Sequence, residues 1–169
     1  MHPCTEGLTF ADQCDFDAVK IWNTCPRGDW MIWLLRKTQS IDRQTSVKLA
    51  CLWAEHVLSI YESKHPDDKC PRLAIEAAKA WADNPTDEKL ALVKLAADEA
   101  WKARRAAYAA TCAAAAAYAA AAAAYAAAYA DAADDAAAYA AYAAADAAAE
   151  RKWQADKIRE LIPCPFENL

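Results

Sequence analysis

Residues 106–149 decide the fold of this 169-residue chain, and they read AAYAATCAAAAAYAAAAAAYAAAYADAADDAAAYAAYAAADAAA. Between positions 113 and 130 every residue is alanine or tyrosine. Alanine is the best helix former, because it loses no side-chain entropy and buries no polar group on folding. Neither glycine nor proline interrupts the chain between Pro85 and Pro163. This alanine tract is therefore predicted to be helical.

The rest of the chain also favours helices. It has only two glycines, and no segment alternates apolar and polar residues as a strand does. We predict one all-α domain, with a tryptophan-rich bundle over 1–105, the alanine tract over 106–149 packed on the bundle or projecting from it, and a helix end and tail over 150–169. Five tryptophans are predicted to form the core: Trp30, Trp33, Trp53, Trp81 and Trp101.

Turn and capping residues place the helices of the bundle. After an irregular lead-in over 1–14, we expect helices over 15–24, from residue 30 onward, over 42–62 and over 71–83, and another that starts at Asn84-Pro85. Asp29 is expected to cap the second helix, and Asn84 the one that follows Pro85. Since residues 30–35 are apolar on nearly every side, the second helix is expected at the buried centre.

The alanine tract either projects or folds back. One straight helix over 86–162 would be ~115 Å long, whereas a compact chain of this size has a radius of gyration of about 15 Å. Asp131, Asp134 and Asp135 mark the best position for a break, because aspartate caps helices and is poor inside them. We predict a hairpin there, with two closely packed alanine faces. A straight rod, which could dimerise, remains the alternative.

Tyrosines mark one side of the tract. Tyr118, Tyr125, Tyr129 and Tyr139 fall within one sector of about 80° at about 100° per residue. Such a stripe is either helix packing or a surface for a partner. We predict that these tyrosines, with Asp131, Asp134 and Asp135, contact a partner protein. The four aspartates of residues 113–149, with no lysine or arginine among them, favour a basic partner.

Charge excludes several classes of function. The net charge is −5 and no basic patch is present, which disfavours nucleic-acid binding and a membrane-surface role. The uncharged run 113–130 is long enough to span a bilayer, but no basic flank or aromatic belt marks its ends. The N-terminus lacks the pattern of a signal peptide. We therefore expect a cytoplasmic protein.

The chain shows no catalytic pattern. It lacks HExxH, GxSxG, a glycine-rich phosphate loop and an EF-hand loop. Its seven cysteines include no CxxC pair, which disfavours a zinc site. We expect no catalytic residue, no metal and no cofactor, and hence not an enzyme.

Several segments together resemble one known family. They are CPRGDWMIWLL (25–35), LAC (49–51), AW (80–81), AADEAW (96–101), the Ala/Tyr/Asp tract and IRELIP (158–163). In these segments the chain is similar to immunity proteins of bacterial toxin–immunity systems and phages. The resemblance implies an all-helical fold, with the RGDWM segment as shared core. It also implies a non-enzymatic role against a partner protein, either a toxin or a defence effector. The tract here lacks the basic residues that members often interleave.

Two classes of function stay open at this stage. One is a binding protein that neutralises a partner, as a bacterial immunity protein or as a phage inhibitor of a host system. The other is a helical protein that sequesters a small ligand between its helices. An ice-binding or purely structural alanine-rich helix fits less well, because the tract holds one threonine, Thr111. Homodimer formation also stays open.

Overall fold

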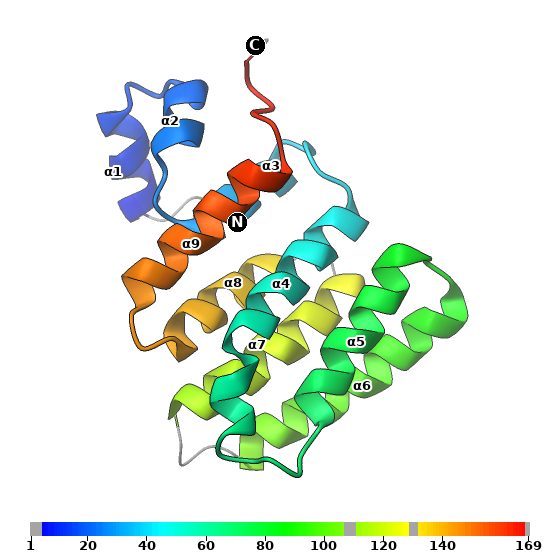
Figure 1. Cartoon of the computed structure of the whole chain (residues 1–169). Helices are drawn as coiled ribbons and strands as arrows, with labels where there is room; N and C mark the ends of the chain where they lie inside the picture. Colours follow the sequence, from blue (N-terminus) through cyan, green and yellow to red (C-terminus); the bar gives the residue numbers. More distant parts are fainter. Residues whose placement is uncertain (1–4, 107–110, 129–131, 168–169) are drawn as a thin grey trace.

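The computed structural model describes residues 5–106, 111–128 and 132–167, and these residues form nine helices and no strand. The helices are α1 (Thr5–Gln13), α2 (Ala18–Thr24), α3 (Gly28–Lys37), α4 (Arg43–Glu62), α5 (Cys70–Asp83), α6 (Asp87–Ala106), α7 (Thr111–Ala128), α8 (Ala132–Ala143) and α9 (Ala147–Leu161) (Figure 1). The predicted all-α fold is confirmed.

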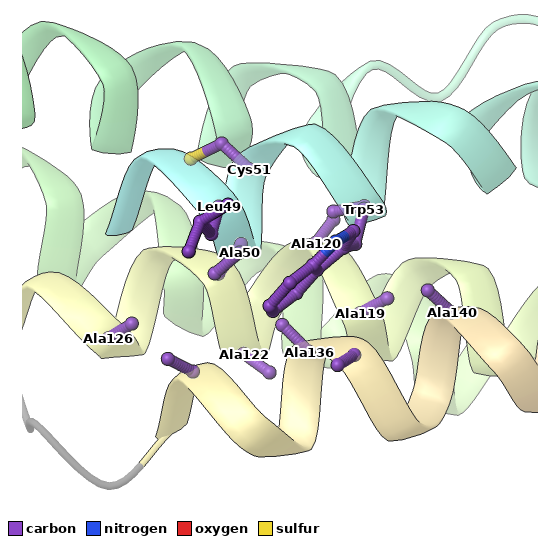
Figure 2. Packing of buried hydrophobic residues seen from close by; sticks show 14 of the residues in the cluster. Leu49, Ala50, Cys51, Trp53, Ala119, Ala120, Ala122, Ala126, Ala136 and Ala140 are labelled. Carbon is purple, nitrogen blue, oxygen red and sulfur yellow. The ribbon is translucent and has the colours of Figure 1, made fainter. Parts of the chain in front are cut away.

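The alanine helix α7 lies at the centre of the molecule, with α4, α5, α6 and α8 packed around it (Figure 1). Its alanines are fully buried at Ala116, Ala120 and Ala123. Because alanine ends at Cβ, neighbouring helices can approach α7 closely on every side and make many small dispersion contacts. Figure 2 shows Trp53 of α4 lying beside alanines of α7 such as Ala120. An alanine helix thus forms the core of this fold.

The expectation that the helix beginning near residue 30 would be the buried centre is wrong. That helix, α3, packs at the edge against α8 and α9. It buries one face, made by Met31, Ile32 and Leu35, whereas Trp30 and Trp33 are only half-buried. Large side chains on the outer face of α3 cannot be buried, because the centre is already filled by α7.

The other three predicted core tryptophans are buried to different extents. Trp53 and Trp81 are buried. Trp101 is half-buried on α6. Of the five predicted core tryptophans, Trp53 and Trp81 are therefore buried, and the other three are half-buried.

The tract folds back on itself. α7 ends at Ala128, α8 begins at Ala132, and the two helices pack side by side (Figure 1). Arg43 of α4 donates a hydrogen bond to the carbonyl of Ala127, which satisfies one of the C-terminal carbonyls of α7. Asp131 and Tyr129 lie outside the described residues. Asp134 and Asp135 fall in the first turn of α8, where negative charge complements the helix dipole.

Residues 86–162 reverse direction at two further places. α6 ends at Ala106 and α7 begins at Thr111, and these helices also pack side by side. Asp146 caps α9, its Oδ1 accepting hydrogen bonds from the backbone N–H of Ala148 and Ala149 at 3.0 Å. The region is therefore built from four helices.

Helix starts near the N-terminus differ from the sequence prediction. Residues 5–13 of the expected irregular lead-in form α1, and Asp17 caps α2, its Oδ1 accepting from Val19 N at 2.9 Å. Asp29 does not cap α3. Arg27 is at that N-cap, and Asp29 sits in the first turn with its carboxylate bonded to the Arg27 guanidinium at 3.1 Å.

The start of α6 also lies further along the chain than predicted. Asn84 ends α5, and Thr86 provides the cap by accepting from Lys89 N at 3.2 Å. Helix α4 begins as predicted, since Asp42 accepts from Thr45 N at 2.7 Å.

Candidate functional site

The described tyrosines of the predicted stripe face neighbouring helices of the bundle. Tyr118 of α7 contacts Tyr139 of α8, with ring centroids 3.7 Å apart, and Trp101 of α6 at 4.9 Å. The Arg104 guanidinium lies over both the Trp101 and the Tyr118 rings. Burial, with Tyr139 and Asp135 nearby, raises the pKa of Tyr118 above its ordinary value. These rings therefore close the edges between α6, α7 and α8.

Tyr125 also points to a neighbouring helix. Its hydroxyl donates to Asp98 Oδ1 of α6 at 2.6 Å. Tyr118, Tyr125 and Tyr139 are half-buried, so each also keeps an exposed edge. Tyr142, one turn along α8 from Tyr139, is 62% exposed. Among the described tyrosines of the tract, the one most open to solvent is thus Tyr142 of α8.

The two described aspartates of the predicted site lie on α8 close to α3. Asp134 forms an ion pair with Arg36 at the end of α3, and Asp135 is exposed. Both carboxylates, with Ala138 one turn further along, border a pocket between α8 and the N-terminal helices. α8 therefore carries the predicted acidic residues on one side and Tyr139 on its contact with α7.

This N-terminal pocket has a volume of about 420 Å³ and is mainly apolar. Its walls come from α1, α2, α3 and α8, and they include Phe10, Trp30, Met31, Trp33 and Leu34. Three carboxylates border it, those of Asp29, Asp134 and Asp135. Among the described residues that line it, none is lysine, arginine or histidine.

The sequence did not predict this pocket, because the residues of two of its walls were expected in an irregular segment or in the core. Phe10 and Phe16 lie in or beside the segment expected to be irregular. Trp30 and Trp33 were expected in the core, and both line the pocket instead. The spacing of Leu8 and Ala11, three residues apart, was the available signal for an amphipathic first helix.

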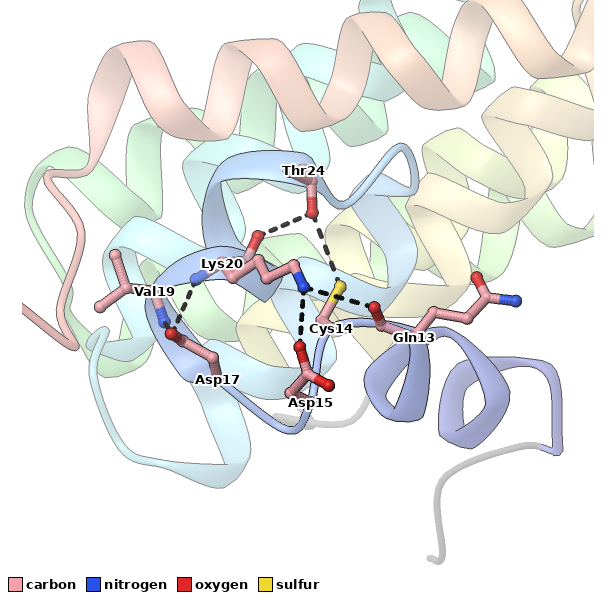
Figure 3. A network of polar contacts seen from close by, with 7 residues as sticks. All are labelled: Gln13, Cys14, Asp15, Asp17, Val19, Lys20 and Thr24. Atoms are coloured by element: carbon pink, nitrogen blue, oxygen red, sulfur yellow. Dashed lines mark hydrogen bonds and ion pairs between the residues drawn. The ribbon is translucent and has the colours of Figure 1, made fainter.

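The turn between α1 and α2 holds an aromatic ring at the pocket mouth. Asp15 and Phe16 have φ of 57° and 53°, a left-handed conformation that costs on the order of 1–3 kcal/mol for a residue other than glycine. Lys20 Nζ stabilises this turn, lying 3.0 Å from Asp15 Oδ2 and donating to the Gln13 carbonyl (Figure 3). Phe16 is left 63% exposed, and Leu8 nearby is 46% exposed.

A buried polar cluster fixes α9 against the bundle. Glu150 is 4% exposed, and its carboxylate lies 2.7 Å from His56 Nδ1 and accepts from Gln154 Nε2 at 3.0 Å. Gln154 also donates to the Ala137 carbonyl of α8. The His56 ring stacks on Trp153 at 3.8 Å. This cluster joins α4, α8 and α9 and has the character of a structural clamp.

The described part of the chain contains no group of three or more histidine, cysteine or acidic side chains placed to hold a metal ion. No described helix is both long and apolar enough to cross a bilayer. Six described cysteines are free thiols. The N-terminal pocket is the candidate binding surface that the described residues form.

The model of one known protein family matches most of this chain. Residues 36–161, about three quarters of the chain, match the model of the family described as "Imm-5 like putative immunity protein". No curated protein and no solved structure matches the chain. The matched span includes the tract and the segments at 49–51, 80–81 and 96–101, whereas the RGDWM segment lies before it. The family indicates an immunity-type role and implies a protein partner, and such families are generally non-enzymatic. This chain belongs to the Imm-5 like family of immunity proteins.

Proposed function

We propose that this protein neutralises a partner toxin or defence effector by binding it, without catalysis, through the surface that α8 shares with the N-terminal helices. The observation that supports this surface is the N-terminal pocket, where Trp30 and Trp33 meet the Asp134 and Asp135 carboxylates. Family membership supplies the immunity-type role, and the pocket supplies a place for the contact.

The chemistry of the pocket suits protein recognition. Binding energy in protein interfaces concentrates where a side chain of the partner enters a well-packed pocket, and aromatic residues are enriched there. Leu8 and Phe16 extend the apolar surface beyond the pocket mouth. Tyr142 of α8, one turn after Ala138, is exposed as well.

The tyrosine face of the tract is a second part of the proposed contact. Because Tyr118 and Tyr125 also pack against α6, replacing them with alanine would disturb the fold as well as the surface. Tyr142→Ser tests the exposed part of this face with little effect on stability, since its side chain is mostly in solvent.

A cytoplasmic location is part of the proposal. The six described cysteines are free, which fits a compartment that keeps thiols reduced. The same binding role would serve a bacterial immunity protein or a phage inhibitor of a host system.

Co-expression with the toxin encoded beside its gene tests the function. Growth of cells that express this toxin should recover when the protein is present. Asp135→Arg reverses an exposed charge at the pocket. This variant should be needed in at least about tenfold larger amount than the wild-type protein to give the same rescue. Asp67→Arg is the matched control, because it makes the same charge change in the exposed loop between α4 and α5.

One outcome of the co-expression experiment would contradict the proposed function. If the wild-type protein gives no rescue and forms no complex with the toxin on size-exclusion chromatography, the immunity-type function fails. If both charge reversals reduce rescue equally, the function stands and the contact lies elsewhere on the surface.

The pocket also favours a second candidate function. Its volume of about 420 Å³ lies within the usual range for small-molecule sites, so an apolar ligand could be sequestered there. Native mass spectrometry of protein purified from the source cell distinguishes the two. A bound small molecule at one per chain would support sequestration.

A further inference from the structure

We propose that the N-terminal pocket receives an arginine side chain of the partner protein, presented next to an apolar residue. This inference rests on the proposed function, because it names the chemistry of the group that the partner inserts. Three features of the pocket favour an arginine: its aromatic walls, its carboxylate border and the guanidinium that its edge already binds.

The walls of the pocket offer flat aromatic surfaces. Phe10 and Trp30 lie with ring centroids 5.9 Å apart, and Trp33 completes the wall from the next turn of α3. An arginine side chain has an apolar stem and a planar guanidinium that stacks on aromatic rings. Such walls therefore accept the stem and the plane of arginine together.

The charge around the pocket complements a cation. Residues 5–38 and 132–143, which include the four helices of its walls, contain seven acidic and four basic residues, a balance of −3 out of the chain's −5. None of the described lining residues is basic, whereas three are aspartates. Asp29 and Asp134 already pair with Arg27 and Arg36, so an entering guanidinium would meet the exposed Asp135 and would share the carboxylates of the other two.

The chain itself shows this mode of binding at the edge of the pocket. The Arg27 Cζ lies 4.4 Å from the centroid of the Trp30 ring. The same guanidinium bonds to Asp29 at 3.1 Å and to Glu6 at 3.2 Å. A guanidinium lying on an indole and paired with a carboxylate is thus a geometry that this surface already stabilises, and Asp134 repeats the carboxylate half of it by pairing with Arg36.

The mouth of the pocket accounts for the apolar neighbour. Phe16 and Leu8 are exposed beside the opening, and the left-handed turn at Asp15 and Phe16 holds the Phe16 ring there. An apolar residue next to the inserted arginine would cover these two side chains. α1 buries none of its residues fully, so its side of the pocket stays open to solvent.

Three matched peptides test the inference with the full-length protein. The probes are acetyl-Ala-Leu-Arg-Leu-Ala-amide and its variants with glutamate or glutamine in place of arginine. Binding is followed by the indole N–H resonances of Trp30 and Trp33, assigned with Trp30→Phe and Trp33→Phe. The arginine peptide should bind about tenfold more tightly than the glutamate peptide at low salt, and this preference should shrink as salt screens the carboxylates.

A charge-matched pair of variants locates the effect. Asp135→Asn should reduce the preference for arginine several-fold, whereas Asp67→Asn, which changes the net charge equally, should leave it unchanged. Equal binding of the glutamine and arginine peptides would show a purely apolar site and overturn the inference. Perturbation of the same resonances by raising the protein concentration alone would assign the pocket to a second copy of the chain and also overturn it.

The outcome is separable from that of the rescue assay. If the toxin is neutralised but the arginine peptide does not perturb Trp30 or Trp33, the inference fails and the proposed function stands. If the arginine peptide binds selectively but the toxin is not neutralised, the proposed function fails and the chemistry of the pocket stands.

Discussion

Trp53 is the largest fully buried side chain among the described residues. It projects from α4 across alanines of α7 and α8, including Ala120 and Ala136 (Figure 2). Its size compensates for the small side chains around it, since a close-packed interior needs large groups opposite small ones. Among the described residues, its buried indole N–H has no hydrogen-bond partner. The ring is therefore held by packing alone.

The orphan N–H predicts how Trp53 tolerates change. Trp53→Ala should destabilise the protein by about 3–5 kcal/mol, because it leaves a large cavity. Trp53→Phe keeps a ring and removes a donor whose burial without a partner costs about 1–3 kcal/mol, so its net cost should be well under half as large. Urea unfolding monitored by circular dichroism measures both. Equal losses for the two variants would mean that the indole N–H makes a bond that matters.

Burial also sets the reactivity of the thiols. It raises the pKa of Cys51 to about 12, and it raises the pKa of Cys25 as well, whereas Cys112 is exposed. Since the thiolate is the reactive form, a raised pKa keeps Cys51 protonated and inert at pH 8. Brief alkylation of the native protein, mapped by mass spectrometry, should label Cys112 and spare Cys51. Denaturant should make Cys51 react. Rapid labelling of native Cys51 would contradict its burial.

At the scale of helices, the small size of the alanine side chain sets how closely the helix axes approach one another. α7 contacts four other helices because alanine on each face allows close approach, and the α7–α8 pair uses alanine on both sides. Such packing is sensitive to added volume, since the described alanines of α7 and many side chains around them are buried and leave little room for a larger group. The α3–α9 pair shows the same dependence at a single position, Gly28.

Enlarging an alanine in the core tests the close packing of α7. Ala120→Leu should destabilise the protein by about 1–3 kcal/mol or more, because extra methylenes must force helices apart. Ala149→Leu, at an exposed position of α9, is the control and should change stability by less than about 0.5 kcal/mol. Denaturant melts give both values. A neutral Ala120→Leu would show that α7 packs loosely.

The crossing of α3 and α9 depends on Gly28. A Cβ added there would lie 2.4 Å from Gln154 Cβ and 3.1 Å from the Gln154 carbonyl carbon, which belongs to the backbone of α9. Gly28→Ala should therefore push the helices apart and destabilise the protein by about 1–3 kcal/mol, despite the higher helix propensity of alanine. Gln154→Ala is a useful comparison, because it removes the side-chain hydrogen bonds of Gln154 and keeps the close approach. If Gly28→Ala is stabilising, the two helices do not meet as described.

At the scale of the whole molecule, the alanine tract converts a potential rod into a compact core. The helices α6, α7, α8 and α9 follow one another with reversals between them, and α7 lies inside the bundle instead of projecting from it (Figure 1). Most helical stability in proteins comes from tertiary packing, and a lone alanine helix would have little of it. Enclosure by α4, α5, α6 and α8 provides that packing.

Small-angle scattering distinguishes the two shapes. A compact chain of this length should have a radius of gyration of about 15 Å, whereas a rod of four consecutive helices would extend well beyond ~100 Å. We expect a globular profile that does not change with concentration. A maximum dimension above ~100 Å would contradict the central position of α7.

The sequence by itself determined the all-helical class of this protein and the approximate positions of most helices, although it missed α1. Alanine content and the rarity of glycine predicted helices throughout, Asp42 marked the start of α4, and Asp131–Asp135 lay close to a true reversal, because propensity and capping are local properties. For the site, it identified Asp134 and Asp135 as acidic positions on the tract but placed Trp30 and Trp33 in the core.

Tertiary structure alone decided which helix is central and where the pocket lies. A helix made almost wholly of alanine has no stripe of large apolar residues to show which way it faces, so its sequence does not reveal that four other helices pack against it. The pocket joins residues 7–34 to Asp134, Asp135 and Ala138, at least 100 positions later in the chain. Contacts of that separation depend on how closely α3 and α8 approach one another, which the side chains of neither segment specify alone.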